Sequence, residues 1–508
     1  MTRIVKKRVF ILAGVFVLLV GVYTFIYSYI SIHYWNNFLD GAFDLGLYDQ
    51  AFWLISTCHL EAYSTFRFVP FAMDHFSLII YPFSILYLIW PSAIFLLIIQ
   101  SLLLGSGMVP LYFLTRNNID SRILSLVLSI CYLLYPPLGG ANLDAFHPEV
   151  LAVPALLWMF WADEGEHYIL FYTMLFLTLI TKELASIVIT AYGIGLVFKK
   201  RYRKGVLLIF IGVLWFAIAY SIINVISSKM GGVDFNDLAR YSYMGNSFGE
   251  IILYLITHPM HSIEVLINGK LYVWQILAPT VFLSLFSPAE LIPAGVVIWI
   301  NLLSNNYLTH LIYLHHTLFI IPFIWYGTIK GLKWIIKLFN RIDKNVTKNV
   351  VAVLFFACSL GMFFKWMLPA ILYRISLNNI LRPQLVEASS LIPGDASLIG
   401  TGYIVAHLSH RQYVYDIDTL VSFKMLNTQG INKMLDQIPR DRALYIFLVP
   451  EMAKKFNQEA KIAEDKLLNM LLNNHTNIIY NQNGVFVFKI EHGSDFVNML
   501  NLRLQNDR

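Results

Sequence analysis

Hydrophobic residues along this chain gather into long runs that short polar segments separate. The apolar runs cover about 9–30, 76–90, 93–115, 122–140, 150–162, 168–181, 184–198, 206–227, 271–286, 289–303, 316–328 and 350–373. A helix needs about 20 residues to cross the hydrocarbon core of a membrane, with a range of roughly 17–25. The pattern therefore predicts a polytopic α-helical membrane protein in which the shorter runs extend into their flanks or tilt.

Basic residues reduce the number of predicted crossings. Arg116 and Arg122 bracket one short loop, and further basic loops lie at 199–204 and 330–348. Such loops favour the cytoplasmic side of a membrane. All of them can share that side if the segment from Asp74 to Trp90, which contains Pro82, forms an interfacial or re-entrant helix instead of a span. About eleven transmembrane helices then remain.

The first apolar run follows Lys6, Lys7 and Arg8 and continues to about Ile30. It is too long for the apolar region of a signal peptide and lacks a small-residue cleavage site, so we expect a retained first span with a cytoplasmic N-terminus. The extracytoplasmic side then receives the segments 31–92, 140–150, 181–183, 228–270, 304–316 and everything after about 374.

The last part of the chain differs from the rest, because its apolar density falls from about residue 380. Short β-like runs occur at 397–400, 412–415, 443–449, 477–480 and 484–490, with a helical pattern at 451–472. The segment 481–484 joins two of these runs in the manner of a hairpin turn. We expect a transmembrane domain at 1–375, with its first outer loop at 31–92, and an extracytoplasmic α/β domain at 376–508.

Composition agrees with a membrane protein, since 57% of the residues are hydrophobic, 13% are charged and the mean hydropathy is +0.62. The net charge of +6 does not indicate nucleic-acid binding, because the basic residues lie in short loops between apolar runs. The three cysteines show no spacing typical of a metal site or of a disulfide framework. We therefore expect membrane lipid as a partner, and no nucleic acid.

Ionisable residues near membrane spans are costly unless they face a cavity or a partner, so each is a functional candidate. The segment Trp35–Trp53 carries Asp40, Asp44 and Asp49, and a short helix there would place Asp40 one turn before Asp44. Further candidates on the predicted outer side are Arg67, Asp74, His75, Asp144, His147, Glu149, Lys182, Glu183, His315 and His316. Because separate loops bring these groups to one side, we expect a convergent outer pocket.

Each candidate also has a structural interpretation. The acids of the first loop are compatible with helix capping, and Asp74 and His75 with a cap of the re-entrant helix. Lys182 and Glu183 are compatible with a mutual ion pair in a tight turn. His315 and His316 are adjacent and lack the i, i+4 spacing of a helical metal pair, so snorkelling at the interface is an equal explanation.

Several phrases of the sequence resemble known families. FDLGLYDQ, DHFSLIIYP, FHPEVLAVP and TKELASIV are similar to phrases of an uncharacterised family of predicted multi-pass membrane proteins, and so is LIPGDASLIGTGYIVAHLSHRQYVY near the C-terminus. The order of these segments resembles the GT-C superfamily of lipid-phosphosugar-dependent glycosyltransferases. That resemblance implies a catalytic acid on the first outer loop, followed by Tyr and a small residue, which Asp44, Tyr48 and Ala51 match. Asp44 is followed by Leu45 where many members have an adjacent acidic pair, so Asp49 is the second candidate.

These observations give a hypothesis for function. The chain is expected to be a glycosyltransferase of the plasma membrane that uses a polyprenyl-phosphate-linked sugar donor at the extracytoplasmic face. Asp44 would deprotonate the acceptor, and Lys182, Arg67 or His147 would stabilise the leaving phosphate. A divalent cation, Mg²⁺ or Mn²⁺, would bind Asp49, Asp144 or Glu149. The alternatives are a transporter or flippase for a lipid-linked or polar substrate, which would be expected to carry repeated halves that are not evident here, and a non-catalytic scaffold.

Overall fold

A computed structural model describes residues 3–229, 236–338, 344–418, 437–456 and 458–496 of the chain. The chain forms two compact units, each assembled from separate segments. The first unit comprises residues 1–31, 72–79 and 97–374, and the second comprises 32–71, 80–96 and 375–508. The predicted first outer loop therefore belongs mostly to the same unit as the C-terminal segment, a grouping that a single division near residue 375 does not give.

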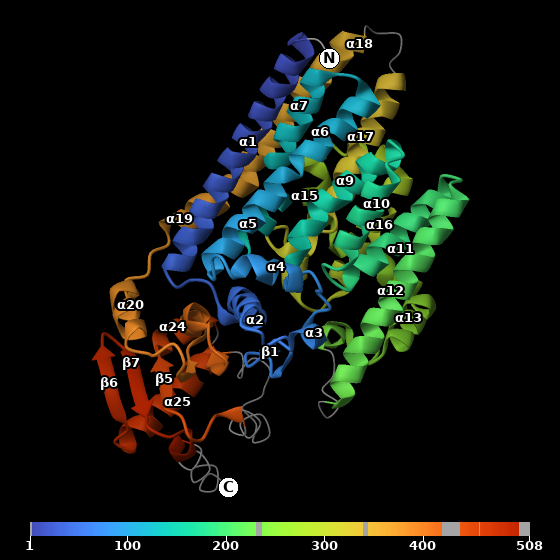
Figure 1. Cartoon of the computed structure of the whole chain (residues 1–508). Coiled ribbons are helices and arrows are strands. Elements are labelled where there is room, and N and C mark those ends of the chain that lie inside the picture. Colours follow the sequence, from blue (N-terminus) through green and yellow to red (C-terminus); the bar gives the residue numbers. More distant parts are fainter. Residues whose placement is uncertain (1–2, 230–235, 339–343, 419–436, 457, 497–508) are drawn as a thin grey trace. The chain divides into compact units, whose positions relative to one another are not determined.

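The first unit is helical (Figure 1). Its elements, some of which continue past the unit's limits, are α1 (Arg3–Asn36), α3 (Phe71–Asp74), α5 (Ala93–Ser106), α6 (Met108–Ile119), α7 (Arg122–Leu133), α8 (Pro136–Leu143), η2 (Pro148–Leu151), α9 (Ala152–Glu164), α10 (Tyr168–Leu179), α11 (Leu184–Phe198), α12 (Tyr202–Lys229), η3 (Asn236–Tyr241), α13 (Phe248–Thr257), α14 (Pro259–Asn268), α15 (Lys270–Leu277), η4 (Ala278–Thr280), η5 (Leu283–Phe286), α16 (Pro288–Leu303), η6 (Tyr307–His310), η7 (His315–Thr317), α17 (Ile321–Leu338), α18 (Lys344–Met362), η8 (Phe363–Met367) and α19 (Leu368–Ser376).

Five helical segments in the described residues are long and apolar enough to cross a membrane, or six if the bent pair of α13 and α14 counts as one span. They are Val9–Asn36, Ala93–Ile119, Arg122–Leu143, Tyr202–Lys229 and Thr347–Ser376. Other predicted runs form shorter apolar helices, such as α10, α11 and α16. The prediction of several spans is confirmed, whereas the number eleven is not, because these helices fall short of the usual spanning length.

The predicted re-entrant segment is broken rather than continuous. Its beginning forms the end of α3, and α4 (Ile80–Tyr87) follows after a turn. With eight residues, α4 is about 12 Å long at 1.5 Å per residue, which is too short to cross a bilayer. The expectation that this segment does not span agrees with the helix lengths.

Small residues allow α11 and α12 to pack closely. A Cβ atom on Gly193 would lie 2.7 Å from the carbonyl oxygen of Gly205, and one on Gly205 would lie 2.8 Å from that of Gly193. The backbones can approach only because both positions lack a side chain, a common device between membrane helices. Another face of α12 exposes Val206, Phe210 and Val213, which is typical of a lipid-facing helix.

The second unit contains a five-stranded sheet in the order β4-β3-β5-β7-β6 (Figure 1). Its strands are β3 (Ser397–Gly400), β4 (Val414–Asp416), β5 (Leu444–Leu448), β6 (Asn477–Gln482) and β7 (Val485–Ile490). β3 is parallel to β4 and β5, and β7 is antiparallel to β5 and β6. Each strand overlaps a β-like run of the sequence, and Asn483 and Gly484, both with positive φ, form the predicted hairpin turn.

The remaining elements of the second unit surround this sheet or belong to the first loop. They are η1 (Ala42–Gly46), α2 (Leu47–Ser56), β1 (Tyr63–Ser64), β2 (Val69–Pro70), α4, α20 (Arg382–Ser390), α21 (Gly402–Val405), η9 (Ala406–Leu408), α24 (Pro450–Phe456) and α25 (Gln458–Asn473). Ala453 of α24 and Leu471 of α25 share a buried core with Ile399 and Ile446 of the sheet. Phe68 of the first loop belongs to the same core.

Hydrogen bonds also explain why the first loop joins the sheet. The Gln50 amide donates to the carbonyl oxygen of Arg411 at 3.3 Å, and the Thr65 hydroxyl donates to the carbonyl oxygen of Val414 at the start of β4. The Val414 amide donates back to Thr65 Oγ1 at 3.2 Å. Because all four groups are buried, these bonds are needed to satisfy polar atoms away from water.

Candidate functional site

Asp44 lies in η1, a π-helical turn that runs directly into α2. Its side chain is half-buried, whereas Tyr48 and Ala51 are each 1% exposed. π-Turns are rare and occur frequently at functional sites. Asp40 lies before this turn in a non-helical stretch, so the prediction that it continues a helical ladder with Asp44 is wrong. The chain bends at Phe38, which has a φ of 55°, and the helix therefore begins after Asp40.

Asp49, one turn further along α2, is buried and surrounded by donors. Its carboxylate accepts hydrogen bonds from the hydroxyls of Tyr87 and Ser409, and His410 Nε2 lies 3.0 Å from Oδ2. The indole of Trp53 stacks near the His410 ring at a centroid distance of 6.1 Å. These contacts hold both oxygens of the Asp49 carboxylate inside the second unit.

The sequence reasoning did not select Tyr87, Ser409 or His410. Ser409 and His410 lie 360 and 361 positions from Asp49, so spacing carries no information about this contact. The closest indication in the sequence is the polar SHRQ segment, which lies within the C-terminal phrase that resembles the uncharacterised family of membrane proteins. Arg67, another candidate of the first loop, places its guanidinium 4.8 Å from the centroid of the Phe43 ring.

Asp144, His147 and His315 converge in the first unit. One potential ligand atom from each residue lies within 4.8 Å of the others. His315 approaches Asp144 Oδ2 with both its backbone nitrogen and its Nδ1, each at 2.8 Å. The rings of His147 and His315 stack with centroids 3.5 Å apart. These donors are suited to a metal ion, and Asp144 is one of the three residues predicted to bind one.

The local backbone explains why these residues meet. A Cβ atom on Gly140 would lie 2.4 Å from the carbonyl oxygen of Ile312 and 2.6 Å from Cα of Tyr313. Only glycine therefore allows α8 to contact the segment that leads into His315. The buried Gln100 amide donates to the carbonyl oxygens of Asn142 at 3.1 Å and Asp144 at 2.9 Å, and its Oε1 accepts from the His147 backbone. Gln100 was not predicted, because a single amide in an apolar run gives no specific signal.

A second pair of contacts adjoins this group. Lys182 Nζ lies 2.7 Å from Glu149 Oε1, with side-chain exposures of 12% and 4%. Glu183 instead accepts a hydrogen bond from the Phe76 backbone nitrogen at 3.0 Å, and its Oε1 lies 4.0 Å from His75 Nδ1. Each of the two residues thus has a partner outside the 182–183 turn. The two neighbours in sequence point to partners in different segments.

Electrostatic interactions connect these residues. Burial alone would raise the pKa of Glu149, but the Lys182 ammonium beside it holds that pKa well below its ordinary value. Burial lowers the pKa of His315 well below its ordinary value, and the nearby His147 and Lys182 lower it further. Glu149 is therefore ionised and His315 is neutral at pH 7.

Four predicted segments therefore meet in the first unit, through His75, the 144–149 turn, residues 182–183, and His315. His316 follows with its ring centroid 4.0 Å from that of His315, and its carbonyl oxygen accepts from Asn301 at 3.0 Å. The residues that could bind a metal differ from the predicted ligands Asp49, Asp144 and Glu149. Asp144 lies together with His147 and His315, whereas Glu149 forms an ion pair with Lys182. Asp44, Asp49 and Arg67 belong to the second unit, and the side chain of Asp74 lies outside the described part.

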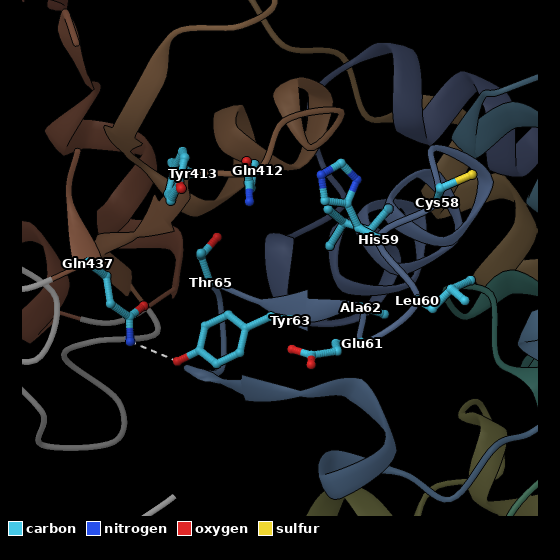
Figure 2. Close-up of a pocket in the computed structure, with 11 residues that line it drawn as sticks. Cys58, His59, Leu60, Glu61, Ala62, Tyr63, Thr65, Gln412, Tyr413 and Gln437 are labelled. Atoms are coloured by element: carbon cyan, nitrogen blue, oxygen red, sulfur yellow. Dashed lines mark hydrogen bonds between the residues drawn. The ribbon is translucent and has the colours of Figure 1, made fainter. Parts of the chain in front are cut away.

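The second unit also contains an open pocket of about 630 Å³ (Figure 2). Its walls come from the end of α2, the loop before β1, and the segment before β4, and Gln437 closes one side with a 2.7 Å hydrogen bond to the Tyr63 hydroxyl. The lining residues are Leu54, Cys58, His59, Leu60, Glu61, Ala62, Tyr63, Thr65, Gln412, Tyr413 and Gln437. Among the residues that the structure describes, this lining includes Glu61 but no lysine or arginine.

Comparison with known proteins gives a family and a fold. The family described as "Predicted membrane protein (DUF2079)" matches residues 34–487. ArnT from Cupriavidus metallidurans bound to undecaprenyl phosphate has a TM-score of 0.56 at 12% identity, over 94% of this chain and 98% of that chain. Its apo state has a TM-score of 0.52 at the same identity and coverage.

A third solved structure is more distant. The archaeal oligosaccharyltransferase AglB from Archaeoglobus fulgidus, in complex with an inhibitory peptide and a dolichol-phosphate, has a TM-score of 0.39 at 12% identity, over 92% of this chain and 74% of that chain. Among curated protein sequences, none matches this chain. The likeness to ArnT identifies a GT-C-like fold, as the sequence resemblance implied.

Proposed function

The chain belongs to the DUF2079 family of predicted membrane proteins, and we propose that it is a membrane glycosyltransferase. It would move a sugar from a polyprenyl-phosphate-linked donor to an acceptor at the extracytoplasmic face of the plasma membrane, with its N-terminus in the cytoplasm and residues 376–508 outside. The observation that carries this proposal is a buried cluster of ionisable residues in a membrane protein with an ArnT-like fold.

The likeness to ArnT supports the class of donor. That protein was solved with undecaprenyl phosphate, and the match covers nearly the full length of both chains. A polyprenyl-phosphate carrier needs apolar surface for its tail and positive charge for its phosphate. The exposed apolar helices of the first unit, including α1 and α12, are suited to the tail.

Asp44 is the proposed base that deprotonates the acceptor hydroxyl. It is the acid of the first loop that matches the GT-C pattern, and its half-buried position in a π-turn leaves it more accessible than Asp49. Asp49, held by Tyr87, Ser409 and His410, is better suited to fixing the conformation of α2. A positioned general base typically contributes 10²–10⁴-fold to a rate.

Lys182 is the proposed partner of the leaving phosphate, with Arg67 as the other predicted cation. The Lys182 ammonium is buried beside Glu149 and two histidines, an environment of low dielectric in which its charge interacts strongly. His75, Glu183 and His316 adjoin this group and are proposed to shape the substrate site rather than to react.

Replacement of the first-loop acids tests the reaction. Asp44→Asn, Asp49→Asn and Asp40→Asn would be purified in detergent, compared by thermal unfolding, and assayed with membranes that supply polyprenyl-phosphate sugars labelled with tritium. We expect the Asp44 variant to fold and to lose at least about 100-fold in transfer, while the matched Asp40 variant keeps its rate. A folded Asp44→Asn protein with unchanged transfer would sink the assignment of the base.

A further inference from the structure

The site formed by Asp144, His147 and His315 has the features of a prearranged metal centre. The three residues come from the end of α8, the turn after it and η7, and their candidate ligand atoms lie within 4.8 Å of one another. Asp144 and His147 are 8% and 3% exposed. Ionisable groups in such a position normally pair with one another or with a bound ion.

The histidines hold their rings in the tautomer that a metal requires. His147 Nδ1 lies 2.8 Å from the carbonyl oxygen of Ala145, which can only accept, so Nδ1 carries a proton and the neutral form of the ring presents the lone pair of Nε2. His315 Nδ1 faces the Asp144 carboxylate at 2.8 Å, which favours the same tautomer. Metal-binding histidines usually donate their second N–H to a carbonyl or carboxylate in this manner.

The carboxylates around the site include one oxygen that is left without a partner. Asp144, Glu149 and Glu183 lie in this cluster with the Lys182 ammonium, and Arg240 is a further cation near His316. Glu149 Oε2 is buried and has no hydrogen-bond partner among the described residues, although Oε1 contacts Lys182. A buried carboxylate oxygen without a partner is costly, and a nearby dication would lower that cost.

We propose that Asp144, His147 and His315 bind a zinc-type divalent cation. Two neutral imidazoles and one carboxylate form a set of three protein ligands, which in zinc enzymes leaves a position open for water or substrate. Magnesium prefers oxygen ligands and is poorly served by two nitrogens. This set of one oxygen and two nitrogen ligands thus differs from the all-carboxylate ligands, Asp49, Asp144 or Glu149, from which the sequence predicts Mg²⁺ or Mn²⁺.

Two features of the fold hold this set in place. Gly140 brings the segment before His315 against α8, and Gln100 fixes the backbone of residues 142–147. Bound there, the ion would supply a Lewis acid for an oxyanion such as a phosphate oxygen. The metal-binding assignment itself does not depend on the proposed transfer reaction, because its test measures binding.

Metal content and titration test the proposal on the purified full-length protein in detergent. After removal of metal with a chelator, ZnCl₂, MnCl₂ and MgCl₂ would be titrated by calorimetry into the wild type, His147→Gln, His315→Gln and the control His258→Gln, at an exposed position of the first unit. We expect Zn²⁺ to bind more tightly than Mg²⁺ in the wild type and in His258→Gln. Each ligand variant should weaken Zn²⁺ binding by at least about 10-fold, as disturbed metal sites commonly do.

Cobalt gives a second measurement that needs no variant. Co²⁺-loaded wild type should show the visible absorption of a four- or five-coordinate site, and Zn²⁺ should displace that signal. Equal Zn²⁺ affinity in wild type and both ligand variants would overturn the proposal, as would tighter binding of Mg²⁺ than of Zn²⁺. If a ligand variant fails to fold, the wild-type Co²⁺ spectrum is sufficient as a test. A spectrum identical to that of Co²⁺ in buffer would overturn the proposed metal site.

Discussion

Glu464 on α25 gives a prediction about how the second unit responds to pH. Its side chain is fully buried, and Oε2 accepts a hydrogen bond from the Val449 backbone nitrogen at 3.2 Å. Burial raises the pKa of Glu464 from 4.5 to about 8, and Asp416 adds to the shift. The pKa of neighbouring Asp418 is raised to about 9 for the same reasons. The folded unit therefore keeps protons that the unfolded chain has released.

The sign of the effect follows from this difference. Between pH 4.5 and about 8 the folded state carries a proton on Glu464 and the unfolded state does not, so stability falls as pH rises and levels off above that window. One proton changes the free energy of unfolding by about 1.4 kcal/mol per pH unit. Across the window Glu464 alone contributes at most about 5 kcal/mol, and the proton on Asp418 adds to the same trend.

Glu464→Gln removes this titration while keeping the shape of the protonated acid. Hydrogen exchange of peptides covering β5, corrected for the intrinsic rate, would be measured at pH 5.5 and 7.5. In the wild type, protection should be weaker at pH 7.5, and Glu464→Gln should reduce this difference to the part that Asp418 contributes. Glu459→Gln, at an exposed position of the same helix, serves as the matched control. Parallel profiles for the wild type and Glu464→Gln would refute the reasoning.

Three further outcomes test the packing around the candidate site. Glu149→Gln and Lys182→Met should each lower the free energy of unfolding by about 3–5 kcal/mol, because each removes one side of a buried ion pair, and the double variant should lose less than the two together. Gly140→Ala should cost about 1–3 kcal/mol by overpacking, whereas Gly361→Ala, with open space at its Cβ, should be near neutral in thermal unfolding. Asp49→Asn should lower the thermal midpoint, since charged hydrogen bonds contribute about 1.5–3 kcal/mol each; unchanged midpoints would contradict these expectations.

Local patterns in the sequence were enough to predict much of the fold. The strands β3 and β7 follow alternating or apolar runs, and Asn483–Gly484 supplies the positive φ values that a two-residue hairpin needs. The apolar runs predicted a membrane protein with several spans. The number of spans was not confirmed, because hydropathy does not show where a helix such as α10 or α16 ends.

Contacts between distant segments could not be predicted from the sequence. His315 lies 171 positions from Asp144, so the sequence gives no sign of their contact. The adjacent His315 and His316 lack the i, i+4 spacing of two metal ligands on one helix, but this spacing rule does not apply to ligands from separate segments. The close approach at Gly140 and the bonds of Gln100 that produce this contact have no local signature. Asp40 was misplaced because the spacing of acids predicts a helix but not the residue at which that helix begins.

The central claim is that this chain breaks the bond between a sugar and a polyprenyl phosphate. Its most direct test uses proteoliposomes that contain the purified protein, an acceptor extract and a donor labelled with tritium in the sugar and with ³²P in the phosphate. A glycosyltransferase should separate the two labels, leaving ³²P-labelled polyprenyl phosphate in the lipid phase and tritium on the acceptor, and Asp44→Asn should not. A donor that crosses the membrane with both labels still joined would contradict the account and indicate a flippase.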